Sequence, residues 1–201
     1  MTNNFDKIKQ ILDFQSEDDF YHLQIIKRKK ENPEIGSNSY VIKTYYIQSI
    51  EYLEDKMPEI INLCDFNNAR AYINLNVRSF ERMAFHTMKK LTDIIMNKDF
   101  KSARKVYESV CGEFGTGRDK TWIIDIDFDD VILDENSDKI KEIEYFIRKL
   151  QSETTHRQIV EKLKTRNGIH LIVSPFNISE FSKVYPKIDI HKNNPTILYT
   201  P

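Results

Sequence analysis

An alternation of apolar and acidic residues over residues 121–130 constrains this chain more than any other stretch. The segment has the sequence Thr-Trp-Ile-Ile-Asp-Ile-Asp-Phe-Asp-Asp, and its β-branched and aromatic residues predict a β-strand. Side chains alternate between the faces of a sheet, so Asp125 and Asp127 should point the same way, roughly 7 Å apart. Two carboxylates on one buried face repel each other unless a cation such as Mg²⁺ or Mn²⁺ lies between them. The alternative is a strand end at which the aspartates begin a solvated loop.

The composition is that of a globular protein with one substantial core. The chain has 201 residues, 40% of them hydrophobic and 30% charged. Its formal net charge of −1 excludes a global attraction to nucleic acid, so any such site must be a local patch. Cys64 and Cys111 are far apart in sequence, which favours a reducing compartment and argues against a zinc knuckle. Without a visible signal peptide or membrane-spanning run, we expect a cytoplasmic protein, or one in the host cytoplasm if viral, with no membrane partner.

Hydrophobic periodicity in the first half predicts a mixture of helices and strands. The expected helices are 5–14, 49–64, 80–96 and 100–110, and the expected strands are 21–28, 40–47 and 69–77. Ser49 should cap its helix. Arg78 precedes a helix start and is a candidate phosphate ligand, with an ordinary surface arginine as the alternative. The basic run 27–30 could contact a phosphate backbone, but we interpret it as a solvated strand end.

The second half predicts a strand, a helix and then a β-hairpin. The expected elements after the aspartate strand are a helix over 138–151 capped by Ser137, strands 158–164 and 169–175, a helix over 178–185, and a final strand pair, 187–191 with 196–199. Asn167-Gly168 is the strongest short hairpin signal in the chain. His170 follows it on a strand, and Asp189 lies between two isoleucines in the last pair.

Three motifs in this half resemble a known family when they are taken in order. They are Ile-Ile-Asp-Ile-Asp around Asp125 and Asp127, Thr-Arg-Asn-Gly-Ile-His-Leu around His170, and Lys-Ile-Asp-Ile around Asp189. Their order and spacing resemble the catalytic core of the archaeo-eukaryotic primase superfamily, the primase-polymerases, over Trp122–Pro201. The chain lacks the zinc-binding insertion that this family often carries. Because it ends soon after the third motif, we expect any helicase to be a separate partner.

The resemblance implies a mixed α+β fold with helix-covered sheets in two lobes. Residues 1–120 would form the N-terminal lobe and residues 121–201 an RRM-like C-terminal lobe, together making one catalytic domain. The implied activity is metal-dependent nucleotidyl transfer, in which nucleoside triphosphates are used to make or extend primers on a single-stranded DNA template. A short stand-alone DNA primase of this kind would suit the replication of a phage or mobile element.

The resemblance also implies roles for particular residues. Asp125, Asp127 and Asp189 would be catalytic and would hold two Mg²⁺ or Mn²⁺ ions, although His191 competes with Asp189 for the third position. The nucleotide would be bound by His170, Arg166, Gly168 and Arg78.

Three other functions fit parts of the pattern. A haloacid-dehalogenase-like phosphatase also places Asp-x-Asp after a strand, but Asp129-Asp130 is too close to supply its further acidic pair. A metal-dependent nuclease would use the same carboxylates and histidine for hydrolysis. A non-catalytic nucleic-acid-binding module would keep the fold with a decayed site, and the intact Asp125, Asp127 and His170 argue against such decay.

Overall fold

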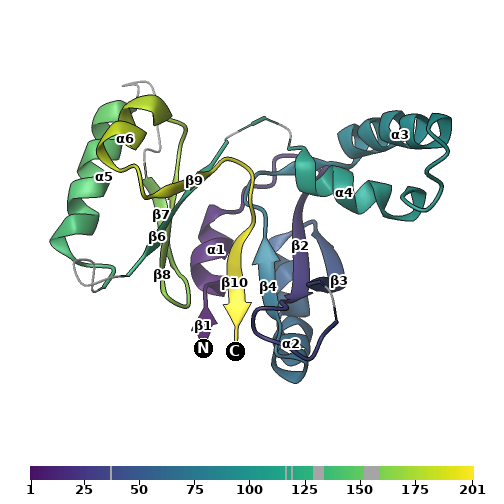
Figure 1. The fold of residues 1–201 in the computed structure, drawn as a ribbon, viewed down its shortest axis with the longest axis horizontal. Helices are drawn as coiled ribbons and strands as arrows, with labels where there is room; N and C mark the ends of the chain where they lie inside the picture. Colours follow the sequence, from purple (N-terminus) through teal and green to yellow (C-terminus); the bar gives the residue numbers. More distant parts are fainter. Residues whose placement is uncertain (37, 116, 119, 129–133, 152–158) are drawn as a thin grey trace.

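The protein has a mixed α and β fold with two antiparallel sheets (Figure 1). The structure is a computed structural model that describes residues 1–36, 38–115, 117–118, 120–128, 134–151 and 159–201. Within these ranges the helices are α1 (Phe5–Ile11), α2 (Ile50–Asn67), α3 (Phe80–Met96), a 3-10 turn (Ala103–Lys105), α4 (Val106–Glu113), α5 (Asp138–Leu150) and α6 (Ile178–Val184). The strands are β1 (Thr2–Asn3), β2 (Asp19–Lys27), β3 (Tyr40–Ile47), β4 (Arg70–Ile73), β5 (Arg78–Ser79), β6 (Trp122–Asp127), β7 (Ile159–Lys164), β8 (Gly168–Val173), β9 (Asp189–His191) and β10 (Thr196–Thr200).

The first sheet has the order β1-β10-β4-β2-β3, and the short β5 pairs with β2. Its largest core joins apolar residues of α1 and α2, such as Ile8 and Leu53, to buried strand residues such as Leu23 and Ile73. A smaller core under α3 and α4 is built on Phe20, and these two helices project from one end of the sheet (Figure 1). No helix in the described part of the chain is long and apolar enough to cross a membrane.

The second sheet has the order β7-β8-β6-β9, and its two faces pack against different parts of the molecule. Ile124, Ile126 and Leu171 lie on the face that α5 and α6 cover. Ile123 and Ile172 lie on the opposite face and join the core of the first sheet. Since side chains alternate along a strand, Asp125 and Asp127 share the face of Ile123 and point toward the first sheet.

Several predictions of local structure are confirmed. Strand 40–47 and helix 80–96 have their predicted bounds. Ser49 and Ser137 cap α2 and α5, each accepting a hydrogen bond from a backbone N–H three residues on. The strand–helix–strand–strand order from β6 to β8 is also observed. The predicted helix 100–110 is displaced, however, because a 3-10 turn precedes α4, and the predicted strand 69–77 stops at Ile73.

The predicted final strand pair is wrong. Strand β9 pairs with β6 in the second sheet, whereas β10 lies between β1 and β4 in the first. All five residues of β10 are buried, so this strand needs partners on both edges, which β9 alone would not supply. Residues 192–195 therefore cross between sheets instead of forming a hairpin, and β10 joins the sheet built from the first half of the chain.

The predicted β7–β8 hairpin is confirmed, but the reason for its glycine differs. The Thr165 N–H donates to the carbonyl of Gly168 at 2.9 Å, so Arg166 and Asn167 form the loop. Gly168 has no left-handed φ and is the first residue of β8. A Cβ at this position would lie 2.8 Å from the Cα of Asp127, closer than real Cβ contacts. The glycine therefore allows β8 to approach β6 closely.

Candidate functional site

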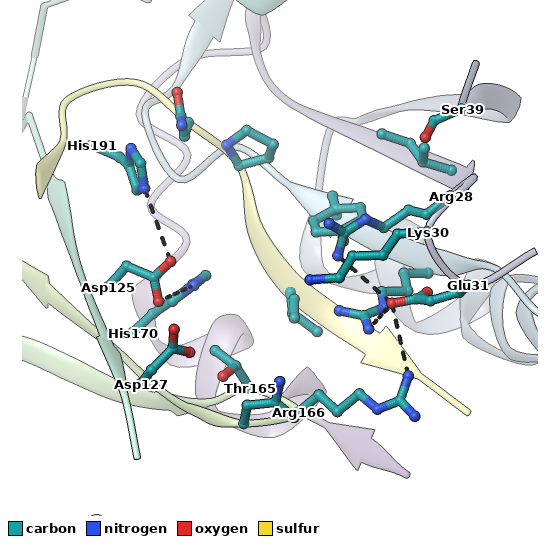
Figure 2. A pocket seen from close by; sticks show the side chains of 17 residues that line it. Arg28, Lys30, Glu31, Ser39, Asp125, Asp127, Thr165, Arg166, His170 and His191 are labelled. Atoms are coloured by element: carbon teal, nitrogen blue, oxygen red, sulfur yellow. Dashed lines mark hydrogen bonds and ion pairs between the residues drawn. The ribbon is translucent and has the colours of Figure 1, made fainter. Parts of the chain in front are cut away.

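A cavity of about 790 Å³ lies between the two sheets and contains most of the predicted site residues (Figure 2). The first sheet contributes the end of β2, the loop that follows it and β4. The second sheet contributes β6, the β7–β8 hairpin and the last residue of β9, and the 192–195 linker closes one side. The cavity is thus assembled from segments far apart in the sequence.

Carboxylates and histidines form one end of this cavity. Asp125 and Asp127 both line it, and His170 is the ladder partner of Asp125 on β8. The His170 Nε2 lies 3.4 Å from one oxygen of Asp125, and the His191 Nε2 lies 4.0 Å from the other. Figure 2 shows the Asp125 carboxylate between the two rings.

The electrostatics of this end favour an ionised Asp125. A hydrogen bond from His170 lowers the pKa of Asp125, and this effect exceeds the opposing influence of burial. On its other side, the His170 Nδ1 is 2.8 Å from the Thr196 hydroxyl, which fixes the ring plane. The acidic end therefore presents a preoriented carboxylate in its charged form.

Cationic side chains form the opposite end. Arg28 and Lys30 come from the segment that follows β2, Arg70 from β4, and Arg166 from the tip of the β7–β8 hairpin. Glu31 lies among them and forms ion pairs with all three arginines. Four cations around one carboxylate leave a net positive charge, which suits an anionic ligand.

The structure brings four of the seven predicted residues into the cavity: Asp125, Asp127, His170 and Arg166. Asp189 is the ladder partner of Asp125 and so lies on the same face of the sheet, but it is exposed and does not line the cavity. His191, two residues on, does line it. Gly168 does not line the cavity; it is the first residue of β8 and shapes the site by letting the hairpin approach the backbone of Asp127. Asp129-Asp130, considered above as a phosphatase pair, is outside the described residues.

Arg78 lies away from the cavity and is fully buried. Its guanidinium donates to the carbonyls of Cys111 and Asn76 and to the side chain of Asn193. Asn193 in turn donates to the carbonyls of Gly112 and Glu113. Arg78 therefore anchors the linker that follows His191, a role that its position before a helix did not suggest.

The basic end of the cavity was only partly predictable from the sequence. The run 27–30 contained two of the lining residues, Arg28 and Lys30, but a charge run is usually solvated, and only the fold shows which cations face the site. Glu31 gave no signal in the sequence.

The donor set at the acidic end fits a hard divalent cation. Among the described residues, no three Asp, Glu, His or Cys side chains converge on one point. Mg²⁺ usually keeps several waters and is bound by one or two carboxylates together with substrate phosphates, so such convergence is not required. Asp125 and Asp127 supply two carboxylates in one cavity whose other end is cationic.

Comparisons of the chain with protein-family models, with curated proteins and with solved structures find no match.

Proposed function

We propose that this protein is a metal-dependent nucleotidyltransferase of the primase-polymerase type, which makes or extends primers on a single-stranded DNA template. One observation carries the proposal: a single cavity has paired carboxylates at one end and four cations at the other, and three of these cations come from the opposite sheet. A nucleoside triphosphate with its metal ions requires this distribution of charge. The order of the three sequence motifs supports the same conclusion.

In this proposal, the residues at each end of the cavity have different roles. Arg28, Lys30 and Arg166 would bind the triphosphate, where positive charge offsets the charge that develops during transfer. His170 is oriented by Thr196 and lies close to Asp125, so it would contact the nucleotide from the acidic end of the cavity. Asp189 or His191, both on β9, would complete the acidic end, and the cavity lining favours His191.

Asp125 and Asp127 would hold Mg²⁺ or Mn²⁺. When bound, such ions supply Lewis-acid activation of the attacking hydroxyl and neutralise the leaving pyrophosphate. In this proposal the two sheets with their helices correspond to the two lobes of a primase-polymerase core, and the β6–β8 region with α5 corresponds to its RRM-like lobe.

Labelled-nucleotide incorporation tests the proposal. Wild type should extend or prime a single-stranded DNA template with Mg²⁺ or Mn²⁺, and Asp125→Asn and Asp127→Asn should each reduce incorporation by at least about 100-fold. These substitutions preserve side-chain shape, and Asp99→Asn, on an exposed turn, is the matched control. Folding is checked by circular dichroism.

Two outcomes would contradict the proposal. If nucleotide incorporation survives in both variants, Asp125 and Asp127 do not hold the metal ions. Template shortening by wild type, lost in the variants, would instead identify a metal-dependent nuclease.

A further inference from the structure

Among the described residues that line the cavity, Glu31 is the one carboxylate at its basic end (Figure 2). Its side chain is 14% exposed and accepts hydrogen bonds from two nitrogens of Arg70, with the Nε at 2.9 Å. The Oε1 atom of Glu31 lies 3.7 Å from the Nη1 of Arg28 and 3.8 Å from the Nη1 of Arg166. Arg166 belongs to the second sheet, so this carboxylate also links the two walls of the cavity.

Hydrogen bonds from two asparagine side chains hold the turn that carries Glu31. Asn32 is buried, and its side chain donates to the carbonyls of Arg28 and Asn68 at 3.0 Å. Asn68 has a left-handed backbone conformation at the end of α2 and donates back to the side chain of Asn32 at 3.1 Å. The turn that carries Glu31 is therefore anchored to the first sheet's covering helix.

The three ion pairs of Glu31 differ in how easily they exchange. The Arg70 pair is bidentate, and the Arg70 side chain is only 8% exposed, so this pair persists. The side chains of Arg28 and Arg166 are 37% and 65% exposed, and their contacts exceed hydrogen-bonding distance. Exposed pairs of this kind contribute little, so a multiply charged phosphate can displace Glu31 as their partner.

We infer that Glu31 is a resident counter-anion that sets how tightly the cavity holds phosphates. It positions Arg70, and it neutralises part of the positive charge of Arg28 and Arg166 until a polyphosphate replaces it as their partner. It remains close by as a like charge that weakens binding and keeps phosphate ligands exchangeable. The inference rests on the proposed function and adds to it a residue that determines ligand affinity.

Calorimetric titration of the full chain with inorganic tripolyphosphate tests this role without turnover. Glu31→Gln keeps an oxygen that can accept from Arg70 but removes the charge, so its Kd should be roughly fivefold lower than wild type at low ionic strength. The difference should shrink as salt is added. Glu31→Asp keeps the charge and should stay near wild type. Glu34→Gln is the matched control, because Glu34 pairs with Lys27 outside the cavity.

A Kd for Glu31→Gln that is unchanged or higher, measured below the melting temperature of the variant, would overturn the inference and leave Glu31 a structural residue. The same holds if Glu31→Asp tightens binding equally, or if neither wild type nor Glu31→Gln binds tripolyphosphate. Nucleotide incorporation is scored separately. Tighter tripolyphosphate binding by Glu31→Gln without any incorporation would refute the proposed function alone, and incorporation with unchanged tripolyphosphate binding would refute this inference alone.

Discussion

Replacing Gly168 by alanine tests how closely the hairpin must approach the aspartate strand. The added Cβ would lie 2.8 Å from the Cα of Asp127 and 2.9 Å from the carbonyl carbon of Ile126, and closer still to the Ile126 oxygen. All of these atoms are backbone. Strand β6 is paired with β8 on one side and β9 on the other, so it cannot retreat without breaking a ladder.

The expected cost follows from these contacts. Overpacking a close-packed site costs about 1–3 kcal/mol, and contact with fixed backbone places this substitution at the upper end, about 3 kcal/mol. Because the φ of Gly168 is not left-handed, alanine also restricts the unfolded chain, which returns about 0.5 kcal/mol. A net loss of about 2.5 kcal/mol should lower the melting temperature by roughly 5–10 °C for a chain of this size.

Thermal and urea denaturation followed by circular dichroism measure this loss. Gly112→Ala is the matched control: Gly112 lies in α4 with no atom within 4 Å of the added Cβ, so alanine there should leave stability unchanged or raise it by up to about 1 kcal/mol. The reasoning is refuted if Gly168→Ala melts within 1–2 °C of wild type, roughly the precision of the measurement. If the hairpin is displaced as expected, nucleotide incorporation should also fall, since Arg166 and Asp127 would move apart.

Two further predictions concern buried polar groups. Burial and, to a lesser extent, the nearby Arg78 lower the pKa of His22 to about 4. The unfolded state therefore takes up a proton between pH 6.5 and 4, while the folded state does not. About 3 kcal/mol of stability, present in full above pH 6.5, should be lost by pH 4. Urea midpoints measured across this range should decline less steeply in His22→Gln, and an equal slope would contradict the assignment. Arg78→Met should cost about 3 kcal/mol, because it leaves the buried Cys111 carbonyl and Asn193 side chain without their donor. A urea midpoint equal to that of wild type would show that Arg78 does not anchor the 192–195 linker.

Local features of the chain were predictable because they depend on neighbours in sequence. Apolar spacing determined helix 80–96 and strand 40–47, and a serine before an apolar run was enough to locate the caps at Ser49 and Ser137. The alternation at Asp125 and Asp127 placed both carboxylates on one face for the same reason, since a strand has a period of two.

Only the tertiary structure decided which elements meet. Periodicity describes which residues are buried but not which strand covers them, so the transfer of β10 to the first sheet could not be derived from 187–199 alone. The basic end of the cavity combines Arg28, Arg70 and Arg166, which are separated by about 40 and 100 residues, and of these only Arg166 was expected at the site, through the family resemblance. Arg78 shows the reverse, because a cation well placed by local pattern is buried once the chain folds around it. The direction that each charged side chain faces depends on long-range packing, so it cannot be predicted from the neighbouring residues in the sequence.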